Sequence, residues 1–326
     1  MLNTQKNFKN RQNISQLNNC PSCKAPCQKS QFLFQSKMLG EDSDIVRCDQ
    51  CNLIYKTVIP SEEGLSKIYS QEYVHFQQHK DLIDIAEFNS AEEKLKKCQK
   101  LLKNYLSKQE LKLLDIGCGS GKFVEIARKL GYNSEGIDPY LPDNVQNTYL
   151  RKISPERVTN NSYDIATLLN VAEHLSQPEL MFSAIYKLLK PNGVFLVTCP
   201  YGNSMGRKIY QHQWNHLVLD EHLLFWTPKS LTHLLREIGF QGKFSYRISG
   251  SPFPLGKINI PSNGSINNAN SQPLNRVTAK SSSSSISSQI WQMGKVIQRQ
   301  KPVANLIRNL IHFSHLGDYL EYAIIK

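Results

Sequence analysis

Short apolar runs alternate with amphipathic stretches along the middle of the chain, between about residues 110 and 250. Glycine, proline or polar residues bound the apolar runs, which therefore predict strands at 111–116, 133–137, 163–169, 194–198 and 242–248. The amphipathic stretches predict helices at 122–130, 178–189 and 227–238. Strands that alternate with helices at this spacing predict a doubly wound α/β sheet, and residues 319–325 predict its last strand.

The remainder of the chain differs in composition and divides into four segments. Residues 1–17 are polar and predict a disordered tail, whereas residues 18–60 hold five of the eight cysteines. Residues 61–108 predict a helical segment, lying as a lid over the substrate region. In 251–316, proline, asparagine and serine dominate up to residue 288, and helical apolar spacing follows from residue 290. We therefore predict a core of residues 109–250 and 317–326 that this insertion interrupts.

The formal net charge of +12 is unevenly distributed. Residues 251–317 carry seven basic side chains and no acidic one, so the predicted core is nearly neutral. A nearly neutral core makes a nucleic-acid partner unlikely, because binding to nucleic acid rests on phosphate contacts by basic groups. The partly apolar and basic segment 290–316 is compatible either with peripheral contact to an anionic membrane or with a helical cover over a pocket. The sequence shows no apolar stretch of membrane-spanning length and no secretory signal, which predicts a cytoplasmic protein.

Two C-x-x-C pairs lie close together near the N-terminus. Four thiolates at this spacing complete a tetrahedral zinc shell, and we predict a structural Zn²⁺ ion bound by Cys20, Cys23, Cys48 and Cys51. Such a shell leaves no open position for catalysis. The alternative is a pair of disulfides, which a cytoplasmic location disfavours. Cys27 is one thiol more than the shell needs.

A glycine-rich turn joins the first predicted strand of the core to its helix. It contains Gly117, Gly119 and Gly121, and glycines let a ligand approach the backbone closely. The dinucleotide fingerprint G-x-G-x-x-G would need a glycine where Lys122 stands. Asp115 lies two residues before the turn, and its carboxylate suits a ligand that carries an ammonium or sulfonium group. A carboxylate at the end of the second strand, Asp138, is placed to accept hydrogen bonds from ribose hydroxyls.

In this order, the motifs resemble those of class I S-adenosylmethionine-dependent methyltransferases, in particular the ubiquinone-biosynthesis-like group, some members of which carry a four-cysteine zinc knuckle. The resemblance covers about 130 residues, from the segment 113–121 to Thr227-Pro228. It implies a Rossmann-like, seven-stranded sheet whose last strand is antiparallel. It also implies that S-adenosylmethionine contacts Asp115, Gly117, Cys118, Gly119, Gly121, Asp138 and Asn170. The adenine contacts stay unassigned.

Candidate catalytic residues follow the central strand and a later loop. Glu173 and His174 come just after the strand 163–169, at the carboxyl edge where α/β proteins bind ligands. In sugar methyltransferases of the resembling group, the matching pair lies at the substrate, so His174 is our candidate for the general base. His222 is a weaker candidate, and both histidines could instead tie loops to the backbone. Tyr73 and Trp214 could line the acceptor pocket, although large aromatic residues are more often simply packed.

The resemblance implies direct displacement of a methyl group onto a small-molecule acceptor, such as a sugar, a quinone or another secondary metabolite. Two alternatives remain open. One is an RNA methyltransferase that uses the zinc knuckle and the basic surface, and the other is a non-catalytic scaffold with a methyltransferase-like fold. The acceptor, the atom that is methylated and the oligomeric state are not readable from the sequence.

Overall fold

The computed structural model describes residues 12–69, 84–102, 107–143, 145, 147–250 and 316–326. The prediction for Tyr73 and nearly all of the predicted insertion at 251–316 therefore lie outside the described residues. No helix within the described ranges is long and apolar enough to cross a membrane.

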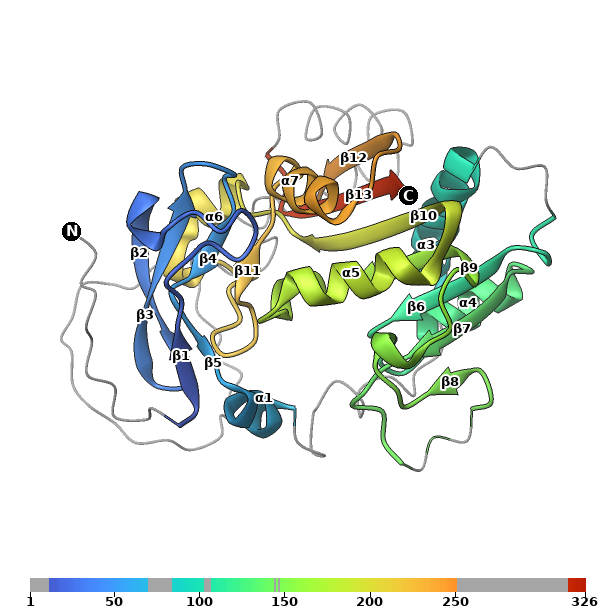
Figure 1. Ribbon diagram of the computed structural model, residues 1–326, viewed down its shortest axis with the longest axis horizontal. Coiled ribbons are helices and arrows are strands. Elements are labelled where there is room, and N and C mark those ends of the chain that lie inside the picture. The colour runs from blue at the N-terminus through green and yellow to red at the C-terminus, as the bar shows by residue number, and fades with distance from the viewer. Residues whose placement is uncertain (1–11, 70–83, 103–106, 144, 146, 251–315) are drawn as a thin grey trace, which may run out of the picture.

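A seven-stranded sheet forms the larger part of the protein, in the order β12-β13-β10-β9-β6-β7-β8 (Figure 1). Its strands are β6 Lys112–Ile116, β7 Asn133–Ile137, β8 Leu150–Arg151, β9 Tyr163–Leu169, β10 Leu189–Pro200, β12 Phe244–Ser249 and β13 Tyr319–Ile325. Strand β13 pairs antiparallel with both β10 and β12, whereas β10, β9, β6, β7 and β8 pair in parallel. The predicted fold class and the antiparallel last strand are therefore confirmed.

The apolar runs differ from the observed strands in two places. Strand β8 is only two residues long, which is too short to leave an apolar run in the sequence. Strand β10 begins at Leu189 rather than at residue 194, and its pairing with β9 shifts register between Leu189 and Val194. The predicted Pro191–Gly193 turn lies within this irregular start, where Asn192 has a φ of 64°.

Helices cover both faces of the sheet. Their bounds are α1 Glu62–Ile68, α3 Ile85–Leu102, α4 Lys122–Lys129, α5 Pro178–Leu188, α6 Met205–Tyr210 and α7 Pro228–Ile238, with short 3₁₀ helices η1 Cys27–Lys29, η2 Pro155–Arg157, η3 Ala172–His174 and η4 Gln211–Gln213. Leu113 on β6 packs with α3 and α4, and its neighbour Leu114 packs in the cluster that contains α5 and α7. This alternation follows from the two-residue period of a strand, and it buries the strands on both faces.

The predicted helical segment 61–108 is divided in the structure. The hydroxyl of Ser61 accepts a hydrogen bond from Gly64 N at 3.1 Å and caps α1, which ends after two turns at Tyr69. Helix α3 then packs against the sheet through Leu95, Cys98 and Leu102. The described part of this segment is thus one short helix near the N-terminal module and one long helix of the core.

The cysteine-rich module contains two small sheets. They are built from β1 Ile14–Gln16 and β5 Val58–Pro60, and from β2 Ser30–Met38, β3 Glu41–Cys48, β4 Ile54–Lys56 and β11 Leu224–Phe225. Strand β1 lies within the segment predicted to be a disordered tail. Strand β11 comes from the core region of the sequence and pairs with β4, so it joins the module to the core (Figure 1).

Candidate active site

The glycine turn lies at the carboxyl end of β6 and leads into α4. Gly119 has a φ of 52°, and a Cβ built on it would meet nothing within 4 Å, so its backbone faces open space. Gly121 has a φ of 81° and precedes the first residue of α4. A left-handed backbone at these positions favours glycine, and the open space at Gly119 gives a ligand close access to the backbone.

Asp115 is buried beneath this turn at the end of β6, with 3% of its surface exposed. The hydroxyl of Thr167 on β9 donates a hydrogen bond to its Oδ1 at 2.6 Å. Burial raises the pKa of Asp115 to about 7, and the Thr167 bond opposes part of that rise. A cationic group at the turn would stabilise the ionised carboxylate, which is the electrostatic condition that the sequence analysis expects.

Asp138 lies at the end of the neighbouring strand β7 and faces the same turn. Its two carboxylate oxygens accept hydrogen bonds from Gly119 N at 3.1 Å and from Tyr140 N at 2.8 Å. Burial raises the pKa of Asp138 above its usual value. The carboxylate therefore orders the turn, and its remaining lone pairs are placed to accept hydrogen bonds from a ligand.

Two further residues that were predicted to contact S-adenosylmethionine lie in different environments. Asn170, just past β9, is exposed with a φ of 55°, and its N–H bonds Thr198 O at 2.9 Å. Cys118 is buried among Val124, Leu141 and Leu150. Asn170 thus lies at the ligand edge of the sheet, whereas the Cys118 side chain packs beneath the turn.

Tyr69 is a site residue that the sequence analysis did not single out. Its ring stacks on Tyr140 at a centroid distance of 4.9 Å, and its hydroxyl lies 3.2 Å from Nδ1 of His174. Tyr69 thus joins the Asp138 side of the site to the His174 side. Its position at the end of α1 leaves no motif in the sequence.

The three candidate catalytic side chains meet on the other side of Tyr69. One ligand atom from each of Glu173, His174 and His222 lies within 4.8 Å of the other two. Glu173 and His174 belong to η3, and His222 reaches them from the loop before β11. The two imidazole rings meet edge to face, with centroids 4.7 Å apart.

Backbone carbonyls orient both histidines. Nδ1 of His222 lies 2.7 Å from His216 O, and Nδ1 of His174 lies 3.1 Å from Glu221 O. Because a carbonyl only accepts, each Nδ1 carries the hydrogen and each Nε2 keeps a lone pair. This tie to the backbone was the structural alternative in the sequence analysis, and Nε2 of His174 lies 4.0 Å from Oε1 of Glu173.

The pKa values of Glu173 and His222 in this cluster are strongly shifted. Burial raises the pKa of Glu173 to about 8, and its Oε2 has no hydrogen-bond partner in the described chain. Burial, reinforced by the neighbouring His174, lowers the pKa of His222 to about 3. A carboxyl that titrates near neutral pH beside two imidazoles can take a proton from a hydroxyl group of the molecule to be methylated. The same three groups could also hold a divalent cation.

The four cysteines of the two C-x-x-C pairs come together as the spacing predicts. Their Sγ atoms all lie within 4.8 Å of one another, with Cys20–Cys51 at 3.6 Å and Cys23–Cys48 at 3.4 Å. Four sulfurs about 2.3 Å from a central zinc ion would stand about 3.8 Å apart, close to the observed separations. Cys27 is outside this group and accepts a hydrogen bond from the Tyr55 hydroxyl at 3.4 Å.

The cysteine module also positions the loop that carries His222. Lys56 on β4 is fully buried, and its ammonium group donates to Lys37 O at 3.1 Å and to Leu219 O. Asp220 accepts a hydrogen bond from Leu39 N at 2.6 Å, and the Lys56 backbone N–H bonds Leu223 O. The loop is thus held between the module and η3, because Leu223 N in turn bonds Glu173 O at 2.8 Å.

Lys56→Met should lower both stability and turnover. The change leaves two buried carbonyls without their donor, which we expect to lower the free energy of unfolding by about 1–3 kcal/mol. The His222 loop would loosen, so kcat should fall while donor affinity is retained. Chemical denaturation and steady-state kinetics measure both effects. Lys37→Met, which removes an exposed lysine in the same sheet, is the control, and equal stability of the two variants would contradict the role of Lys56.

Trp214 is not free to line an acceptor pocket. Its indole is 3% exposed, donates to Asp318 Oδ1 at 3.2 Å and packs against Phe225. Trp214 therefore follows the packed alternative of the sequence analysis, since its ring lies in a buried cluster with Phe34 and Ile45 of the module.

A protein family and several curated proteins resemble part of this chain. A family described as "Methyltransferase domain" matches residues 76–242, which is half of the chain. A "Ubiquinone biosynthesis O-methyltransferase" from Rickettsia canadensis is 28% identical over 146 residues, covering 41% of this chain and 59% of that protein. The protein of the same name from Bartonella tribocorum is 29% identical over 136 residues, covering 38% and 52%. The chain thus spans between half and two thirds of the length of these curated relatives.

Solved structures show the same kind of similarity at lower identity. A SAM-dependent methyltransferase from Archaeoglobus fulgidus is 18% identical with a TM-score of 0.44, covering 73% of this chain and 94% of that chain. Phosphoethanolamine N-methyltransferase 2 from Haemonchus contortus, in complex with S-adenosyl-L-methionine, is 13% identical with a TM-score of 0.46, covering 90% and 71%. On the strength of the family match, this chain belongs to the methyltransferase domain family.

Proposed function

We propose that the protein transfers a methyl group from S-adenosylmethionine to a hydroxyl of a small-molecule acceptor. One observation carries this proposal. The strands β6, β7 and β9 end side by side, so Asp115, Asp138 and the cluster of Glu173, His174 and His222 share one edge of the sheet. Donor and acceptor can therefore meet there.

The protein would bind S-adenosylmethionine through negative charge and through close approach of the ligand to the backbone. The buried carboxylates Asp115 and Asp138 favour a ligand that carries ammonium and sulfonium charges, and Gly119 leaves room for it. Because the sulfonium already activates the methyl group, the main task of the protein is alignment of the two reactants. Alignment contributes about 7–11 kcal/mol in favourable systems.

The acceptor side would remove a proton. The pKa of Glu173 is raised to about 8, near neutral pH, so Glu173 is our candidate for the base, and the His174 and His222 side chains beside it would orient the hydroxyl. Such a base contributes roughly 10²–10⁴-fold. The curated relatives named as ubiquinone biosynthesis O-methyltransferases favour a small acceptor that is methylated on oxygen.

We further propose that Cys20, Cys23, Cys48 and Cys51 hold a structural Zn²⁺ ion. Their separations fit a tetrahedral shell, and all four donors are protein sulfurs, so the ion would have no open position. Its role would be to fold the sheet that positions the His222 loop.

Asp138→Ala tests the donor site directly. Loss of the carboxylate should weaken S-adenosylmethionine binding about 10- to 100-fold, because the ligand loses hydrogen bonds to the charged oxygens of Asp138. Isothermal titration calorimetry measures the affinity, and circular dichroism checks that the fold persists. Asp42→Ala, which removes an exposed carboxylate on β3, is the matched control. Unchanged affinity in Asp138→Ala would refute the assignment.

A further inference from the structure

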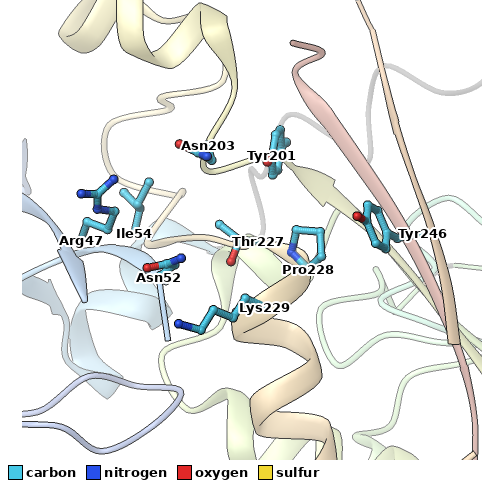
Figure 2. A pocket seen from close by; sticks show the side chains of 9 residues that line it. All are labelled: Arg47, Asn52, Ile54, Tyr201, Asn203, Thr227, Pro228, Lys229 and Tyr246. Atoms are coloured by element: carbon cyan, nitrogen blue, oxygen red, sulfur yellow. The ribbon is translucent and has the colours of Figure 1, made fainter. Parts of the chain in front are cut away.

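A cavity of about 210 Å³ lies between the cysteine module and the core (Figure 2), and Glu173, His174 and His222 are not among its lining residues. Arg47 and Asn52 reach it from the module, Tyr201 and Asn203 from the segment after β10, and Lys229 from the first turn of α7. This volume is below the roughly 300–1,000 Å³ of pockets that enclose a drug-sized ligand. The cavity therefore suits a small group, or one end of a larger molecule.

The lining of the cavity is positively charged. Arg47 and Lys229 contribute two cations, and none of the lining residues is acidic. The Arg47 guanidinium donates a hydrogen bond to the neutral amide oxygen of Gln31 at 2.5 Å. An anionic group in the cavity would thus meet two cations whose charge no lining carboxylate neutralises.

A third cation lies near the cavity, because Arg207 interacts electrostatically with the lining residues Arg47 and Tyr201. Arg207 is 5% exposed, its Nε donates to Gly202 O, and it forms no ion pair with any carboxylate that the structure describes. Burial and the nearby Arg47 lower the pKa of Arg207 to about 10. A buried cation without a counter-charge is costly, and an anion in the cavity would offset that cost.

Two more features favour an anion at this place. Helix α7 begins at Pro228 beside the cavity, so the positive end of its dipole faces the lining residues Thr227 and Lys229. The side-chain amide of Asn203 also lines the cavity, and its N–H groups can donate to an anion (Figure 2). Guanidinium, ammonium and amide groups with a helix N-terminus are the set that recognises phosphate.

We propose that this cavity binds a phosphate group, either as the free anion or as the phosphate end of a larger molecule. The site does not depend on the proposed methyl transfer, because its residues lie outside both the donor turn and the catalytic cluster.

Titration calorimetry of the zinc-loaded full chain with inorganic phosphate, in a low-salt chloride buffer, tests the proposal. We expect one saturable site, binding at least 10-fold weaker in Lys229→Gln, and no detectable binding in Arg47→Gln/Lys229→Gln. Lys100→Gln removes an exposed lysine on α3 and should bind phosphate like the unchanged protein. Since Arg47 adjoins Cys48, zinc content is measured in every variant, and Lys229→Gln is decisive if Arg47→Gln loses zinc.

Parallel titrations separate the two sources of the phosphate and the two proposals. Tighter binding of glucose 1-phosphate than of inorganic phosphate indicates a phosphorylated molecule, whereas equal or weaker binding indicates the free anion. S-Adenosylmethionine affinity should stay unchanged in Lys229→Gln, so failure of the donor site is seen independently. No saturable phosphate binding by the unchanged protein, or equal binding by Lys229→Gln, would overturn the proposed site.

Discussion

Cys51→Ser should unfold the N-terminal module and reduce methyl transfer at least 100-fold. The variant removes one of four zinc ligands, and structural zinc sites contribute roughly 10–16 kcal/mol to the folding of small zinc domains. The sheet β11-β4-β3-β2 would lose its anchor, and with it the bonds from Lys56 and Leu39 that hold the His222 loop. Zinc content by atomic absorption, circular dichroism and activity measure the three effects.

The chain supplies a matched control in Cys27. This thiol is buried in the same module but lies outside the four-sulfur group, and serine can still accept the hydrogen bond of Tyr55. Cys27→Ser should therefore retain one zinc ion per chain and most of its activity. Equal zinc content in Cys51→Ser and Cys27→Ser would contradict the assignment of the ligands.

The link between the zinc module and the active site could not be predicted from the sequence. Strand β11 is two residues long, and it pairs with β4 across about 170 positions of the chain, so no local periodicity marks it. Lys56 would be expected at the surface, yet it is fully buried because two backbone carbonyls satisfy its ammonium group. Long-range pairing and buried polar contacts emerge only when distant segments pack together.

The position of the predicted donor-binding residues at one edge of the sheet, by contrast, could be predicted from local signals in the sequence. Glycines at 117, 119 and 121 mark a turn, and carboxylates at the ends of two parallel strands must face the same edge. The same rule placed Glu173 and His174 near that edge. It did not show that His222 would join them, since His222 belongs to a loop whose course depends on the zinc module. Tyr69 was missed for the same reason, because it reaches the site from the end of a separate helix.

The alternatives from the sequence analysis can be weighed against this geometry. A non-catalytic scaffold would have no need for a buried Glu173 oxygen that lacks a hydrogen-bond partner in the described part of the chain and lies beside two oriented imidazoles. Such groups are costly to bury, and proteins tend to retain them where they act on a ligand. The cluster therefore favours an enzyme over a scaffold and directs the decisive test to Glu173.

Glu173→Gln should lower kcat about 10²- to 10⁴-fold and remove the rise of activity with pH. In the unchanged protein, activity should increase as Glu173 ionises near pH 8, since only the carboxylate accepts a proton. Glutamine keeps the size of the side chain but cannot act as a base. A pH profile of kcat on the acceptor, together with the S-adenosylmethionine affinity, separates lost proton transfer from lost binding.

The same variant should be more stable than the unchanged protein at pH 8. The unfolded chain loses the Glu173 proton near pH 4.5, whereas the folded chain keeps it until about pH 8, so the unfolded state binds fewer protons across this window. Stability therefore falls as the pH rises from about 4.5 to 8, and Glu173→Gln removes this loss. Thermal melting should show similar Tm values at pH 4 and a higher Tm for Glu173→Gln at pH 8. Glu179→Gln, which changes an exposed carboxylate on α5, should show no such gain. A variant that is both inactive and less stable at pH 8 would mean that Glu173 holds the loop in place rather than accepting a proton.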